Sequence, residues 1–99
     1  MKYIIKRLDK FNEWLESLND GLTRQRLVKR LRKAALGNLG DIVPVRYGVM
    51  EMREHFGPGW RMYFVRRDSF LIVMLNGGDK STQQVDIHEA IELAEALED

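Results

Sequence analysis

Hydrophobic residues recur at intervals of three and four in three stretches of the chain, and this is the period of an amphipathic helix. The stretches cover residues 9–19, 22–36 and 85–97. In the last one, Asp86 followed three residues later by Glu89 resembles a capping box at the start of a helix. The pattern therefore predicts two helices in the first half of the chain and one at its end.

A different period, in which every second residue is apolar, begins beyond Ile42 and is typical of β-strands. It predicts strands at residues 49–53 and 60–66, while the continuous apolar character of residues 70–76 suits a central strand. A further short strand is expected at residues 2–7, before the first helix.

These elements give the order β-α-α-β-β-β-α. We expect an α+β fold in which the two amino-terminal helices and the carboxyl-terminal helix pack on a small, mainly antiparallel sheet. We also expect a single domain over residues 1–99, because independent cores usually need about 100 to 150 residues each.

Composition narrows the class of protein. Hydrophobic residues make up 44% of the chain and charged residues 31%, which is typical of a folded domain and excludes general disorder. The absence of cysteine excludes disulfides and Cys-ligated metal sites. The longest apolar run, Phe70 to Leu75, is far shorter than the roughly 20 residues that cross a bilayer. We therefore expect a cytoplasmic protein with no membrane contact.

The net charge of +1 hides two opposed blocks. Residues 1–40 hold ten basic and four acidic side chains, a net charge of +6, and residues 79–99 hold one and seven, a net charge of −6. On the second predicted helix, five basic residues lie opposite the apolar side: Arg26, Lys29, Arg30, Arg32 and Lys33. This side is either a solubilising surface or a binding surface for RNA or for an acidic protein partner.

Signatures of several enzyme classes are missing. The two histidines, His55 and His88, lack the spacing of metal ligands, and residues 77–81 lack the upstream glycine of a phosphate-binding loop. We therefore expect neither a metal nor another cofactor.

The side chains that remain for chemistry are cationic. Arg53 and Arg61 flank the turn at residues 57–59 and, in a hairpin, can lie side by side on one sheet face. Two guanidinium groups placed in this way bind an anion such as a phosphodiester, or else they pair with acids such as Glu51. Lys80 follows the last strand and either joins the arginines or is an ordinary loop lysine.

Three further side chains have both a functional and a structural interpretation. Tyr63 shares a strand face with Arg61 and either stacks on a nucleic-acid base or packs in the core. His55 and His88 can exchange protons near neutral pH, although a surface histidine is more often inert.

Several blocks, taken together in this order, resemble the RelE/ParE toxin superfamily, and within it the HigB-like, phage-derived branch described as addiction-module killer proteins. The blocks are Phe11-x-x-Trp14-Leu15-x-x-Leu18, Arg30-Leu31, Gly37 to Asp41, Gly48-Val49, Met52-Arg53, Gly57 to Phe64 and Gly77 to Gln83. The resemblance implies a microbial-RNase-like fold and ribosome-dependent cleavage of messenger RNA (mRNA). It also implies a cognate antitoxin, usually a helix-turn-helix protein.

The resemblance implies roles for single residues as well. Arg61 matches the strand arginine that contacts the scissile phosphate, Lys80 a second active-site base, and Arg53 a basic residue of the preceding strand. The implied reaction is attack of a ribose 2′-hydroxyl on the adjacent phosphate, which needs no metal. The two arginines would hold the phosphate, and Lys80 would stabilise charge or donate a proton.

The chain departs from the pattern of this superfamily at two places. The lysine pair that several relatives carry is replaced by Val49 and Glu51, and the late tyrosine or histidine falls near Ile87 or His88. Glu51 and His88 are therefore the candidates for the base. RNA or ribosome contacts are expected from the five basic helix residues and from Tyr63.

Two other functions fit the same resemblance. One is a ParE-like protein that poisons DNA gyrase by binding, without catalysis. The other is a non-toxic homologue that only binds its antitoxin.

Overall fold

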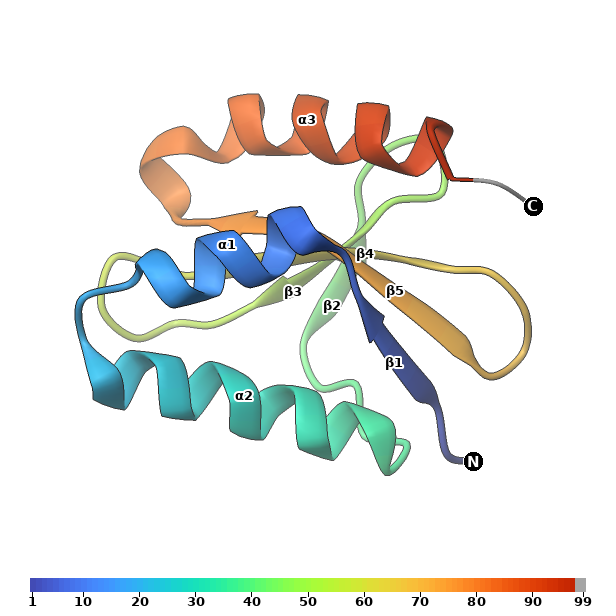
Figure 1. Ribbon diagram of the computed structural model, residues 1–99, viewed down its shortest axis with the longest axis horizontal. Helices are drawn as coiled ribbons and strands as arrows, with labels where there is room; N and C mark the ends of the chain where they lie inside the picture. Colours follow the sequence, from blue (N-terminus) through green and yellow to red (C-terminus); the bar gives the residue numbers. More distant parts are fainter. Residues whose placement is uncertain (98–99) are drawn as a thin grey trace.

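The chain is described by a computed structural model over residues 1–97, and it forms three α-helices, one short 3₁₀ helix and five strands (Figure 1). The elements are β1 (Ile4–Arg7), α1 (Asp9–Ser17), α2 (Gly21–Ala35), β2 (Ile42–Pro44), β3 (Met50–Arg53), β4 (Arg61–Arg66), β5 (Leu71–Gly78), η1 (Lys80–Thr82) and α3 (Gln83–Glu95). The sheet order is β1-β5-β4-β3-β2, with β1 parallel to β5 and the other neighbours antiparallel. The predicted α+β class is confirmed.

One strand lies outside the predicted order. The short strand β2 pairs with β3 at the edge of the sheet. Three residues are too few to show a period, and Pro44 fits only an edge because it has no N–H for a second neighbour. This strand matters for the site because it brings Asp41 beside the end of β3.

The last helix begins earlier than its sequence pattern indicates. It starts at Gln83, so Asp86 lies inside the first turn and the predicted capping box is wrong. Instead, the hydroxyl of Thr82 donates to the Asp86 carboxylate across 2.7 Å. A second difference is the end of α1, which stops at Ser17, two residues before the predicted end.

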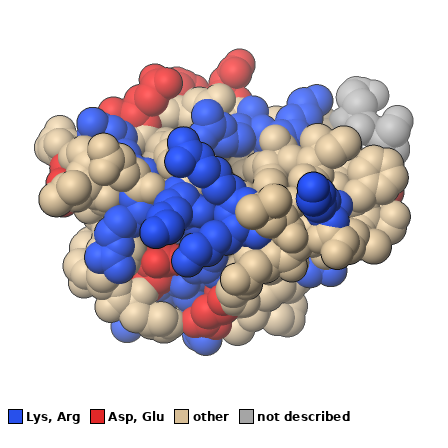
Figure 2. Space-filling view, turned by 90° about the horizontal axis from the view of Figure 1, so that it is seen from below, with Lys and Arg blue, Asp and Glu red and all other residues tan. Residues whose placement is uncertain are grey.

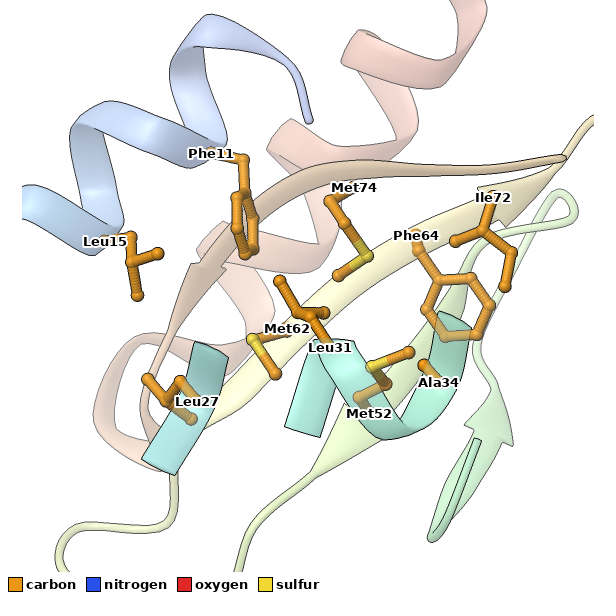
Figure 3. Close-up of a cluster of buried hydrophobic side chains, with 10 residues drawn as sticks. All are labelled: Phe11, Leu15, Leu27, Leu31, Ala34, Met52, Met62, Phe64, Ile72 and Met74. Atoms are coloured by element: carbon orange, nitrogen blue, oxygen red, sulfur yellow. The ribbon is translucent and has the colours of Figure 1, made fainter. Parts of the chain in front are cut away.

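The helices cover both faces of the sheet, with α1 and α2 on one face and α3 on the other. Figure 3 shows the first core, in which side chains of both helices meet those of the strands: Phe11, Leu15, Leu27, Leu31, Ala34, Met52, Met62, Phe64, Ile72 and Met74. The second core lies under α3 and includes Tyr63, Val65 and Ile87. The predicted alternation along β4 is therefore confirmed, because Met62 and Phe64 face one way and Tyr63 and Val65 the other.

Helix α2 begins at a side-chain cap. The Asp20 carboxylate accepts from the backbone N–H of Leu22 and from the hydroxyl of Thr23, each across 3.0 Å. These bonds lower the pKa of Asp20 below its ordinary value, with the Thr23 bond the larger cause. Within residues 1–97, no helix is long and apolar enough to span a membrane.

Candidate functional site

The two arginines of the predicted cationic site occupy paired positions on neighbouring strands. Arg53 of β3 and Arg61 of β4 are direct partners in the register of the hairpin. The turn between the strands closes because Gly57 and Gly59 take φ angles of +58° and +82°, a region that favours glycine. The hairpin prediction is thus confirmed for the backbone.

Arg61 is buried and held on three sides. Its Nε lies 3.7 Å from a carboxylate oxygen of Glu51, and its Nη1 donates to the carbonyl oxygens of Glu54 and Trp60, each across 3.0 Å. Only 4% of its side chain is exposed. Its Nη2 makes no hydrogen bond within the described residues and is the nitrogen left for an anion.

Glu51 holds Arg61 in place and does not face solvent. Its carboxylate is buried, and it accepts a hydrogen bond of 2.8 Å from Nε2 of Gln83 at the start of α3. Both carboxylate oxygens therefore have a partner inside the fold, one Arg61 and the other Gln83. A carboxylate in this position anchors the arginine.

The side chains of Lys80 and Arg61 both lie beside Gly59. It opens η1, which Asp79 caps by accepting from the backbone N–H of Ser81 across 2.7 Å. A Cβ on Gly59 would lie 3.0 Å from Cγ and Cδ of Lys80 and 3.6 Å from Nη1 of Arg61. The lysine stem therefore packs on the glycine, and its exposed ammonium makes no ion pair within residues 1–97.

Arg53 belongs to a charged group that sequence patterns did not reveal. Its Nη2 donates to Oδ1 of Asp41 across 3.0 Å, and Nε2 of His55 lies 2.7 Å from Oδ2 of the same carboxylate. The hydrogen bond with His55, and then that with Arg53, holds the pKa of Asp41 below its ordinary value. Asp41 thus aligns a histidine and an arginine near the turn end of the hairpin.

Two predicted site residues lie elsewhere. Tyr63 is completely buried under α3, so the prediction that it contacts RNA is wrong, and burial followed by the charge of Glu51 raises its pKa. His88 is exposed on α3, where Nε2 lies 3.2 Å from a carboxylate oxygen of Glu92. Within the described residues, no hydrogen bond or ion pair joins His88 to Arg53, Arg61 or Lys80.

Arg30 is a structural residue inside the fold. Its five N–H groups all have acceptors: the carbonyl oxygen of Leu39 twice, the carbonyl oxygens of Asp41 and Arg53, and the carboxylate of Glu54. A Cβ on Gly40 would lie 3.0 Å from the same guanidinium. Arg30 therefore fastens α2 to the Asp41 loop and to the end of β3, with no donor left for RNA.

The other basic residues of α2 divide into two groups. Lys29, Lys33 and Arg26 border a hollow with Glu54, next to the hairpin turn, and the Arg26 guanidinium stacks 3.6 Å from the centre of the Phe56 ring. Arg32 lines a separate pocket with Arg7 and Arg24. Figure 2 shows the Lys and Arg side chains gathered over the side of the molecule seen from below Figure 1, where α2 runs.

A comparison with known sequences gives one informative relative. No protein-family profile matches the chain. An uncharacterized protein of Haemophilus influenzae is 38% identical over 93 residues, which is 94% of each chain. The chain belongs to the same family as this protein.

Solved structures identify the fold. The free toxin RelE of Escherichia coli, a double arginine-to-alanine mutant, superposes with a TM-score of 0.74 at 14% identity, covering 98% of this chain and all of RelE. The toxin–antitoxin complex RelBE2 of Mycobacterium tuberculosis contains a chain with a TM-score of 0.67 at 16% identity, covering 81% of this chain. This chain therefore has the RelE fold, as the resemblance implied.

Proposed function

We propose that this chain is the toxin of a toxin–antitoxin pair, from the HigB-like branch of the RelE/ParE superfamily, and that it cleaves mRNA on the ribosome without a metal or other cofactor. The observation that carries the proposal is a group of three basic residues. Arg61 and Lys80 both lie beside Gly59, and Arg53 pairs with Arg61 on the neighbouring strand. Three cations at one hairpin form a site for a phosphodiester. The RelE fold and the sequence blocks support the same conclusion.

In the proposed reaction, a ribose 2′-oxygen attacks the adjacent phosphorus and the bond to the 5′-oxygen of the next nucleotide breaks. The products are a 2′,3′-cyclic phosphate and a free 5′-hydroxyl. Nη2 of Arg61 and the guanidinium of Arg53 stabilise the charge that develops on the phosphoryl oxygens. The ammonium of Lys80 stabilises the leaving 5′-oxygen and supplies its proton.

A base must accept the proton of the 2′-hydroxyl, and we propose His55 for this role because it shares the Asp41 carboxylate with Arg53. Glu51 is buried, and His88 pairs with Glu92 on α3. When Nε2 of His55 donates to Asp41, its Nδ1 carries a lone pair that can accept a proton. We therefore assign the base to His55 instead of to the two residues that the sequence favoured.

The exposed cations of α2 extend the site along the RNA. Arg26, Lys29 and Lys33 border the hairpin turn and offer contacts to the phosphates of mRNA or ribosomal RNA. The toxin acts in the cytoplasm, and its partner is a helix-turn-helix antitoxin.

Expression in growing bacteria with mapping of RNA ends tests this function. The wild type should arrest growth and produce mRNA cuts that disappear when translation is blocked. Lys80→Met should lose both effects, while Lys2→Met, an exposed lysine at the amino terminus, should keep them. Growth arrest with DNA damage and no mRNA cuts would instead show a gyrase poison.

A further inference from the structure

A pocket of about 330 Å³ lies between α1 and α3, beside the end of β5. Strand β1 pairs with β5 only as far as Met74, so within residues 1–97 the end of β5 has no strand beside it on that edge. Asn76 and Gly77 of this uncovered part line the pocket together with side chains of the two helices. None of the lining residues is among the three proposed phosphate-binding cations.

Two glycines make room for side chains that line this pocket. A Cβ on Gly77 would lie 2.5 Å from the ring of Trp14, and a Cβ on Gly78 would overlap Oδ2 of Asp86. The indole and the carboxylate therefore lie directly against the backbone of β5. A larger residue at either position would displace one of them, so the end of the strand is shaped for these two side chains.

Asn76 brings a buried acceptor without a partner to the pocket. Only 1% of this residue is exposed, and its Nδ2 donates to the carbonyl oxygen of Asp86 across 3.1 Å and to Oε1 of Glu89 across 3.0 Å. These two bonds use both N–H groups of the amide. Its Oδ1 has no hydrogen-bond partner within residues 1–97, so it is the end of the amide left for a ligand. A buried carbonyl oxygen in this state favours a ligand that donates a hydrogen bond.

The lining of the pocket has an excess of negative charge. Glu13, Asp86 and Glu89 contribute three carboxylates, whereas Lys10 contributes one ammonium, 3.5 Å from Oε2 of Glu89. Burial raises the pKa of Asp86, the hydrogen bond from Thr82 opposes this rise, and the charge of Glu89 adds to it. The charge of the ionised lining is therefore −2, and it favours a cation.

The same lining favours an organic ammonium over a metal ion. Within the described residues, no three Asp, Glu or His side chains are placed to hold a metal. Trp14 offers an aromatic wall on which methylene groups can pack and near which a positive charge is stabilised. An ammonium group has three N–H donors, and Oδ1 of Asn76 and the carboxylates of Asp86 and Glu13 are acceptors for them.

We propose that this pocket binds a small aliphatic diamine. One ammonium group donates to Oδ1 of Asn76 and to the carboxylates of Asp86 and Glu13, and the methylene chain packs against Trp14. A diamine is favoured over a monoamine because its two positive charges balance the two excess negative charges of the lining. The proposal goes beyond the proposed function and does not depend on RNA cleavage.

Nuclear magnetic resonance of the full-length, ¹⁵N-labelled chain tests the site with putrescine, a four-carbon diamine. Saturable shifts should concentrate on the side-chain amide of Asn76 and the indole N–H of Trp14. The matched probe is the same four-carbon chain with a trimethylammonium group at each end, which keeps both charges but has no N–H donor. It should bind about tenfold less tightly or worse. Equal affinities, or shifts that do not saturate and spread over all acidic residues, would overturn the proposal.

Two pairs of substitutions locate the site. Glu13→Gln/Asp86→Asn removes two charges from the lining at nearly constant shape and should weaken putrescine binding about tenfold or more. The control pair Glu16→Gln/Glu95→Gln removes the same charge from exposed positions of α1 and α3 outside the pocket, and it should change binding less than about twofold. Equal losses in the two pairs would show a general attraction to negative charge and would overturn the proposal.

Circular dichroism checks that each variant is folded. Glu13→Gln alone changes an exposed residue and should already weaken putrescine binding about threefold. The test therefore does not depend on the folding of the variant at Asp86. Unchanged affinity in a folded Glu13→Gln variant would contradict the assigned contact.

Discussion

The guanidinium of Arg61 and the carboxylate of Glu51 form an ion pair inside the fold, with 3.7 Å between Nε and the nearer oxygen and both side chains buried. The pair ties β4 to β3, and Gln83 extends it to the start of α3. The position of the proposed phosphate-binding arginine is therefore fixed by the core under α3.

This pair should show strong energetic coupling. Arg61→Met leaves the Glu51 carboxylate buried without its cation and should lower the free energy of unfolding by about 3–5 kcal/mol. Glu51→Leu should lower the free energy of unfolding by a similar amount, because it leaves the Arg61 guanidinium buried without its anion. The double variant should be more stable than the sum of the two losses predicts, as measured by urea denaturation. Additivity within about 0.5 kcal/mol would show that the two side chains do not interact.

Arg30 should be a stability determinant and not an RNA contact. Arg30→Met removes all five hydrogen bonds and leaves the carbonyl oxygens of Leu39 and Asp41 without this donor. We expect a loss of at least about 3 kcal/mol in the free energy of unfolding. Lys33→Met, an exposed change on the same helix, should stay within about 0.5 kcal/mol of the wild type. Similar stabilities for the two variants would refute the structural role.

Alanine substitutions at two glycines can distinguish the effect of backbone strain on stability from the effect of site geometry on activity. Gly59→Ala should lower the free energy of unfolding by about 1–2 kcal/mol through the left-handed backbone. Its new Cβ should also displace Lys80 and reduce mRNA cleavage. Gly48→Ala is the matched control, because Gly48 has a φ of +81° and no atom within 4 Å of the new Cβ. It should be destabilised by a similar amount and keep its activity, whereas equal activity in both variants would argue against a role for Lys80.

The Asp41 contacts should make stability depend on pH in acid. The pKa of Asp41 is depressed in the folded state from its ordinary value of 3.8, so its contribution to stability is complete above that value and is lost as the pH falls through the folded pKa. The difference in unfolding free energy between the wild type and Asp41→Asn should therefore shrink as the pH falls from about 5 to below about 4. A difference that stays the same or grows over that acidic range would contradict the assigned contacts.

Sequence patterns predicted the elements that depend on local rules. The alternation along β3 and β4, together with the glycine turn, indicated that Arg53 and Arg61 can lie side by side, and in the structure they are register partners while Met52 pairs with Met62. The same alternation could not show which part of the sheet face that carries Arg61 is exposed and which part is covered by α3. Tyr63 shares it with Arg61, but α3 packs over the tyrosine.

The interactions that sequence patterns missed depend on segments far apart in the chain. A helical wheel places Arg30 on the basic side of α2, yet the side chain turns toward the Leu39 and Asp41 carbonyls once the following loop folds back. Asp41 reaches Arg53 only because β2 pairs with β3, and this strand is too short to recognise. The residues from Gly37 to Asp41 indicated a structured loop, but they did not indicate which side chains this loop contacts.

Cleavage of a defined mRNA on purified ribosomes tests the central claim most directly, with sequencing of the cut ends and assay of their phosphates. The account predicts that the wild type produces fragments that end in a 2′,3′-cyclic phosphate, and that Lys80→Met cuts about 100-fold more slowly or worse, with unchanged thermal stability. Intact mRNA in the presence of a wild-type protein that arrests growth, or equal rates for the two proteins, would contradict it.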